Sequence, residues 1–187
     1  MEVILVRHGD KDVQRGDYNL SPQGFQRAVA LATLIPACFG RPTRITTFYL
    51  DPISSKNARS YQTAVPLAVA TGVNIGIDEA SRLNSFDQGQ RLREAASSTK
   101  ERVVLFWEHR RMPELARGLG WDAMPEIAND DFDQLILFRF AAAGAVPEVQ
   151  RYSQRDLFQR RCYRQGSGVL PGGPITPPSA APSPSKP

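Results

Sequence analysis

Short apolar runs that alternate with amphipathic stretches constrain the fold of this chain more than any other feature of its sequence. The apolar runs predict strands at residues 2–6, 45–50, 73–77, 102–107, 132–140 and 146–152. The amphipathic stretches predict helices at residues 22–35, 57–71, 89–98 and 113–119. Strands separated by helices favour an α/β fold in three α/β/α layers, with a mostly parallel mixed sheet in the centre.

Boundary residues support several of these helices. Ser21 is a typical N-cap, and Pro22 fits the first position of a helix, where its missing N–H has no partner to lose. Gly72 and Gly120 follow the second and the fourth predicted helix, and glycine at that place is a common helix stop.

The C-terminal segment differs in composition from the rest of the chain. From Gln165 onward the sequence is rich in Pro, Gly and Ser and has few large apolar side chains. Such a segment cannot bury enough surface to offset the entropy of ordering. With 187 residues and 41% apolar content, we expect one domain over residues 1–164 and a disordered tail over residues 165–187.

The net charge of +4 favours an acidic partner, which could be a phosphate ester, a nucleic acid or an acidic protein. Much of the positive excess lies in residues 151–164, which we interpret as a solvated Arg-rich face, because no aromatic and basic pattern of an RNA-binding module is present. No apolar stretch is long enough to suggest a membrane span or a secretory signal, so we expect a cytoplasmic protein with no membrane partner.

Both histidines of the chain follow predicted strands. Arg7 and His8 come directly after the first strand, and His109 comes shortly after the strand at residues 102–107. Open α/β sheets bind ligands beyond the carboxyl ends of their strands. Two histidines at equivalent edges therefore favour one shared site over two unrelated structural residues.

Four motifs in this order resemble those of the histidine phosphatase superfamily, also called the phosphoglycerate mutase-like family. The family's Arg-His-Gly triplet after the first strand is matched by Arg7, His8 and Gly9, and its Leu-Thr/Ser-x-x-Gly helix start by Leu20, Ser21 and Gly24. Its Ser-Pro-x-x-Arg-Ala-x-Gln-Thr-Ala segment is matched by Arg59, Gln62, Thr63 and Ala64. Its second histidine is matched by His109. The stretch before Arg59 is longer than usual, and Ser60 replaces the family's alanine. The matches cover most of residues 1–120.

The resemblance implies a phosphoglycerate mutase-like fold and a mechanism without metal or cofactor. His8 would attack phosphorus and form a phosphohistidine, while its other ring nitrogen donates to a backbone carbonyl. Arg7 and Arg59 would bind the phosphoryl oxygens, because a planar guanidinium offers paired donors. His109 would stabilise the charge that builds on the transferring group, and Gly9 would allow a close backbone approach or an unusual turn.

The proton donor to the leaving group is the weakest part of the match. In this family it is often a glutamate in the loop after the third strand, and an alignment on Leu83 and Asn84 places Ser85 there. Serine is too weak an acid for that role. Asp87 is the nearest carboxyl and our predicted acid, with Glu79 and Glu108 as further candidates. Strand alternation would point Glu108 away from His109 unless the strand has already ended.

A missing acid argues against mutase activity and favours substrates with a good leaving group. The sequence therefore predicts a metal-independent phosphatase for a phosphomonoester or a phosphohistidine, carried by a phosphorylated small molecule or a phosphoprotein. An alternative is a phosphate-binding pseudoenzyme of the same fold. A third hypothesis is an RNA-associated basic protein that binds RNA through residues 151–164. We do not favour it, and we expect no nucleic-acid partner. The sequence does not determine the oligomeric state.

Overall fold

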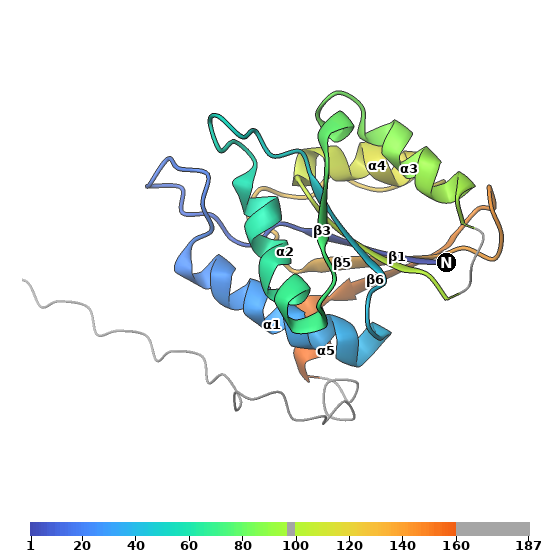
Figure 1. The fold of residues 1–187 in the computed structure, drawn as a ribbon, viewed down its shortest axis with the longest axis horizontal. Coiled ribbons are helices and arrows are strands. Elements are labelled where there is room, and N and C mark those ends of the chain that lie inside the picture. Colours follow the sequence, from blue (N-terminus) through green and yellow to red (C-terminus); the bar gives the residue numbers. More distant parts are fainter. Residues whose placement is uncertain (97–99, 160–187) are drawn as a thin grey trace, which may run out of the picture.

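The computed structural model of the protein describes residues 1–96 and 100–159, which form a central six-stranded sheet with helices on both sides (Figure 1). The sheet has the strand order β3-β2-β4-β1-β5-β6. The strands are β1 (Glu2–Arg7), β2 (Arg44–Phe48), β3 (Ile75–Asp78), β4 (Arg102–Trp107), β5 (Gln134–Arg139) and β6 (Glu148–Ser153). The helices are α1 (Pro22–Phe39), α2 (Ala58–Thr71), α3 (Ser85–Glu94), α4 (Met112–Gly118) and α5 (Gln154–Gln159), and the short 3₁₀ turns η1 (Glu79–Arg82) and η2 (His109–Arg111) precede α3 and α4.

The sheet is mixed and mostly parallel, which confirms the predicted fold class. β1 and β2 each lie parallel to β4, and β3 lies parallel to β2. β5 and β6 are antiparallel to their neighbours. The helices α1, α2 and α5 lie on one side of the sheet, and α3 and α4 lie on the other (Figure 1).

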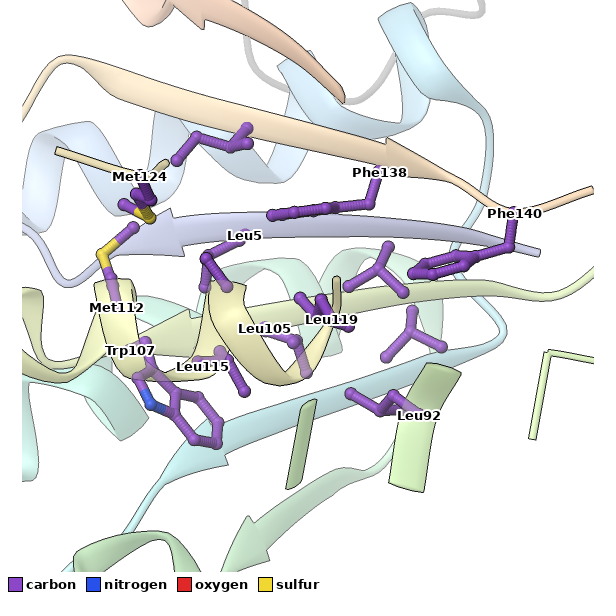
Figure 2. Packing of buried hydrophobic residues seen from close by; sticks show 14 of the residues in the cluster. Leu5, Leu92, Leu105, Trp107, Met112, Leu115, Leu119, Met124, Phe138 and Phe140 are labelled. Carbon is purple, nitrogen blue, oxygen red and sulfur yellow. The ribbon is translucent and has the colours of Figure 1, made fainter. Parts of the chain in front are cut away.

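Alternate residues of the central strands feed two separate hydrophobic cores. Ile4 and Val6 of β1 pack toward α1 and α2, whereas Val3 and Leu5 pack toward α3 and α4. Figure 2 shows the second core, where side chains of α3 and α4 lie against the sheet. A central strand that is buried on both faces reads as a continuous apolar run, and β1 and β4 are therefore the clearest strands in the sequence.

Several element boundaries differ from the prediction. Helix α1 continues through Pro36 to Phe39, and Gly40, with φ 88°, ends it by donating its N–H to the Pro36 carbonyl. Helix α3 begins at Ser85 and not at residue 89, because the Asn84 side chain accepts a hydrogen bond from the Asp87 N–H and caps the helix there. The short helix α5 was not expected. The predicted boundary at 164 and the predicted tail lie outside the described residues, so both stay predictions.

The register of the sheet decides where the two histidines meet. Arg7 pairs with Trp107 in the parallel ladder between β1 and β4, so both strands end at the same level. The residues that follow them therefore emerge side by side at one edge of the sheet. No helix in the described part of the chain is long and apolar enough to cross a membrane.

Candidate active site

A cavity of about 310 Å³ lies where the segments after β1 and β4 meet the start of α2. Its wall includes four cationic side chains, Lys11, Lys56, Arg59 and Arg110, and one carboxylate, Glu108. The remaining lining residues are His8, Tyr18, Asn57, Ser60, His109 and Asn129. A cavity with this charge balance favours a small, multiply charged anion.

His8 is buried, with 4% of its surface exposed, and its ring is held in one orientation. Its Nδ1 lies 2.8 Å from the Gly9 carbonyl oxygen, and since a carbonyl only accepts, Nδ1 carries the proton. Burial lowers the pKa of His8 to about 3, and the charges of Arg7, Arg59 and His109 act in the same direction. The ring is therefore neutral at neutral pH, and its Nε2 keeps a free electron pair that can attack an electrophile.

Gly9 lies against the start of α1, as close backbone approach requires. A Cβ at Gly9 would lie 2.7 Å from the Gly24 carbonyl oxygen, so a larger residue does not fit without a shift of the backbone. The Gly9 N–H donates to Thr63 Oγ1 at 2.9 Å. Gln62 accepts from the Leu20 N–H. Gln62 and Thr63 support the packing and do not line this cavity.

Glu108 lies in the cavity wall because β4 ends at Trp107, which frees residue 108 from the strand alternation. Its carboxylate accepts from the Arg110 Nε at 2.9 Å and lies 3.0 Å from His109 Nδ1. Burial raises the pKa of Glu108, but the hydrogen bonds and charges of His109 and Arg110 outweigh that effect and lower the pKa to about 2. Glu108 is thus ionised at neutral pH.

Arg7 has partners other than those predicted. It is buried, and its Nη1 donates to the carbonyl oxygens of Ala128 at 2.7 Å and Asp131 at 2.6 Å, while its Nη2 donates to the Asn129 carbonyl at 2.8 Å. Its guanidinium carbon lies 3.8 Å from the centre of the Phe132 ring. Arg7 therefore anchors residues 128–131 and does not line the cavity. Burial lowers its pKa to about 10, so it stays charged.

Asn129 was not identified from the sequence and contacts the second histidine directly. His109 Nε2 lies 2.8 Å from Asn129 Oδ1, and the rings of His8 and His109 have centroids 6.1 Å apart. The structure thus brings the two histidines together, and Asn129 faces the Nε2 of His109. Asn129 follows His109 by twenty residues in a segment without periodic pattern, and nothing in the sequence marks it.

Arg59 lies in the first turn of α2 and lines the cavity, where the resemblance placed it. Its Nη1 donates to the Asp17 carbonyl at 2.9 Å, and its guanidinium lies 5.9 Å from the Tyr18 ring centre. The described residues offer no acceptor to its Nε and Nη2. Lys56 and the left-handed Asn57, with φ 68°, precede it in the same wall.

Asp87 does not reach the cavity, which corrects the prediction that it faces the site. It lies in the first turn of α3, exposed to solvent, because Asn84 starts that helix earlier than expected. Glu79, in η1, is exposed as well and is absent from the cavity wall. Ser85, at the position of the family glutamate, is buried and accepts a hydrogen bond from the Trp107 indole at 3.1 Å. Of the three candidate carboxyl groups, Glu108 alone lines the cavity.

The described residues do not form a metal site. Within residues 1–96 and 100–159, no group of three or more His, Cys, Asp or Glu side chains is arranged to hold a metal ion. The donors that surround the cavity are mainly nitrogen cations, and such groups bind anions.

Comparison with known proteins bears on the family and the fold. A family model described as the histidine phosphatase superfamily (branch 1) matches residues 3–126. No curated protein matches the sequence. Among solved structures, the protein histidine phosphatase SixA complexed with tungstate has a TM-score of 0.62 at 12% identity, over 84% of this chain and 99% of that chain.

Two further solved structures have the same fold. A mycobacterial glucosyl-3-phosphoglycerate phosphatase complexed with VO3 has a TM-score of 0.53 at 17% identity, over 80% of this chain and 96% of that chain. The putative phosphohistidine phosphatase SixA from Agrobacterium tumefaciens has a TM-score of 0.50 at 17% identity, over 81% and 97%. At these identities the likeness shows a shared fold, and it confirms the phosphoglycerate mutase-like architecture.

Proposed function

The chain belongs to branch 1 of the histidine phosphatase superfamily, and on that premise we propose that it is a metal-independent phosphatase that forms a phosphohistidine on His8. The observation that carries the proposal is the state of His8. Its ring is buried and neutral, its Nδ1–H is fixed on the Gly9 carbonyl, and it lines a cavity rich in cations. A neutral imidazole with one free nitrogen is a competent nucleophile.

The proposed reaction has two steps. In the first, His8 Nε2 attacks phosphorus while the bond from phosphorus to the leaving atom breaks, and the electron pair departs with the leaving group. In the second, water attacks the same phosphorus and gives one proton to a phosphoryl oxygen of the product, the bond to Nε2 breaks, its electron pair returns to the ring, and inorganic phosphate is released. Arg59 and Lys56 are positioned in the cavity wall to offset the phosphoryl charge in both steps.

Arg7 and His109 have supporting roles in this proposal. The Arg7 charge helps to keep His8 unprotonated and adds to the attraction for an anion. His109 would donate to a phosphoryl oxygen from Nε2, the nitrogen that now faces Asn129 Oδ1. A direct phosphoryl contact by Arg7 would require residues 128–131 to shift, because their carbonyl oxygens occupy its terminal nitrogens.

The low pKa of Glu108 bears on the class of substrate. A carboxylate that stays ionised to about pH 2 holds no proton to give to an alkoxide at neutral pH. It can instead accept a hydrogen bond from the attacking water. Substrates whose leaving group departs without help from an acid, such as phosphohistidine or a phosphoanhydride, therefore suit the site better than alkyl phosphomonoesters. Two of the solved structures with this fold, a protein histidine phosphatase and a putative phosphohistidine phosphatase, also favour a phosphohistidine substrate.

The test compares the wild type with His8→Ala, in EDTA, on a phosphohistidine peptide and on an alkyl phosphomonoester. We expect the wild type to hydrolyse the phosphohistidine peptide faster than the ester, and the variant to hydrolyse neither. An alkaline quench during turnover should trap a phosphorylated wild type and no phosphorylated variant. More than a few per cent of wild-type turnover in folded His8→Ala would exclude His8 as the nucleophile.

The pseudoenzyme alternative has its own support. Asn129 faces the outer nitrogen of His109, backbone carbonyls occupy Arg7, and the single cavity carboxylate is ionised. A wild type that binds inorganic phosphate but neither turns over nor traps a phosphohistidine would favour this alternative.

A further inference from the structure

Ser60 carries a buried hydroxyl that has no hydrogen-bond partner among the described residues. It is the third residue of α2, and only 1% of its surface is exposed. No group in the described part of the chain lies within hydrogen-bonding reach of its Oγ. Because buried hydroxyl groups are almost always hydrogen-bonded, this orphan group requires an explanation.

Ser60 does not use the usual partner of a helical hydroxyl. Serine and threonine in helices commonly donate to the carbonyl four residues earlier. Two other hydroxyl groups of α2 do so, since Thr63 Oγ1 lies 2.7 Å from the Arg59 carbonyl and Thr71 Oγ1 lies 2.7 Å from the Leu67 carbonyl. The corresponding carbonyl for Ser60 belongs to Lys56, outside the helix, where it accepts from the Asp51 N–H at 3.0 Å and not from the Ser60 hydroxyl.

The surroundings of Ser60 indicate what its missing partner is. The residue lines the same cavity as Arg59, its neighbour in α2, and His8. The helix start is not capped by a side chain, because Asn57 is left-handed and forms no capping hydrogen bond. The start of a helix carries partial positive charge, and Lys56 and Arg59 add full charges beside it. An anion with several acceptor oxygens is the complement of this wall.

We propose that the Ser60 hydroxyl donates a hydrogen bond to a nonbridging oxygen of the bound phosphoryl group. The inference rests on the proposed function and adds a substrate-binding residue at a position where the family's motif has alanine. Among the described residues the hydroxyl has no partner in the free protein, and a rotation of the Ser60 side chain toward the cavity would pair it with the phosphoryl oxygen in the complex. Ser60 therefore destabilises the free fold and strengthens phosphate binding, two effects of opposite sign on one side chain.

The experiment measures inorganic phosphate affinity by calorimetry and the thermal unfolding midpoint of the free protein, for the wild type and Ser60→Ala. We expect the variant to bind phosphate about tenfold more weakly, as for the loss of one hydrogen bond to a charged group. The same variant should unfold at a higher temperature than the wild type, because alanine removes the unpaired hydroxyl and favours the helix.

The matched control is Thr47→Val. Thr47 lies in β2 and is fully buried, and its Oγ1, like the Ser60 Oγ, has no partner in the described part of the chain, but Thr47 is not part of the cavity wall. Its variant should raise the unfolding temperature and leave phosphate affinity unchanged. Equal phosphate affinity of Ser60→Ala and wild type would overturn the role of Ser60 alone. A wild type that binds no phosphate would instead overturn the proposed function.

Discussion

The neutral state of buried His8 predicts a specific dependence of stability on pH. The pKa of His8 is about 3 in the folded protein, against an ordinary value of 6.5. Between these values the unfolded chain binds a proton at His8 and the folded protein does not. Proton binding therefore stabilises the unfolded state as the pH falls, and the wild type loses stability through His8 from pH 6.5 downward.

The perturbation that isolates this effect is His8→Asn, whose amide can still donate to the Gly9 carbonyl but does not titrate. Between its ordinary pKa and pH 4.5, a span of about two pH units, His8 is protonated in the unfolded chain only. Each unit lowers the free energy of unfolding of the wild type by about 1.4 kcal/mol, which gives about 3 kcal/mol in total. Glu108 has a lowered pKa, so its contribution is present above pH 4.5 and is lost toward pH 2. Ending the series at pH 4.5 keeps the two effects apart.

The assay is urea unfolding of both proteins at intervals from pH 8 to pH 4.5. Every other titrating group is common to the two chains, so the difference between their free energies of unfolding reports His8. We expect that difference to move by about 3 kcal/mol in favour of the variant as the pH falls. A difference that stays constant within 1 kcal/mol would mean that His8 titrates alike in both states, and the argument for a neutral nucleophile would fail.

Three further substitutions test other parts of the site. Gly9→Ala should lower the free energy of unfolding by about 1–3 kcal/mol in urea titrations, because its Cβ would lie 2.7 Å from the Gly24 carbonyl oxygen; an unchanged stability would show that the two segments can separate freely. Arg59→Lys should weaken inhibition by inorganic phosphate about tenfold, since an ammonium cannot offer paired donors, and equal inhibition would assign Arg59 to structure alone. Asn129→Ala should strengthen that inhibition several-fold by freeing His109 Nε2, and weaker inhibition would mean that Asn129 orients His109 for binding.

The parts of the site that follow from chain topology could be predicted from the sequence. His8 and His109 meet because parallel strands in register end together, and the apolar runs of β1 and β4 make that pairing visible. The family motif on α2 identifies Arg59 as a candidate for the site.

What the sequence did not indicate depends on contacts between distant segments. Asn129 reaches His109 from a loop with no periodic pattern. The partners of Arg7 are backbone carbonyl oxygens. Every residue has such a group, so these contacts do not depend on particular side chains and cannot be recognised in the sequence. The prediction for Asp87 is wrong because Asn84 caps α3, which therefore begins at Ser85. Asp87 then lies in the first turn of the helix and is exposed to solvent.

The Thr63 hydroxyl joins the two halves of the site through one atom. It accepts from the Gly9 N–H, next to the nucleophile, and donates to the carbonyl of Arg59, whose guanidinium lines the cavity. The backbone beside the nucleophile and the backbone that carries the Arg59 side chain are therefore held together before any ligand arrives. A ligand that enters loses its own freedom of motion but does not have to assemble the site, which leaves more of the interaction energy for the transferring group.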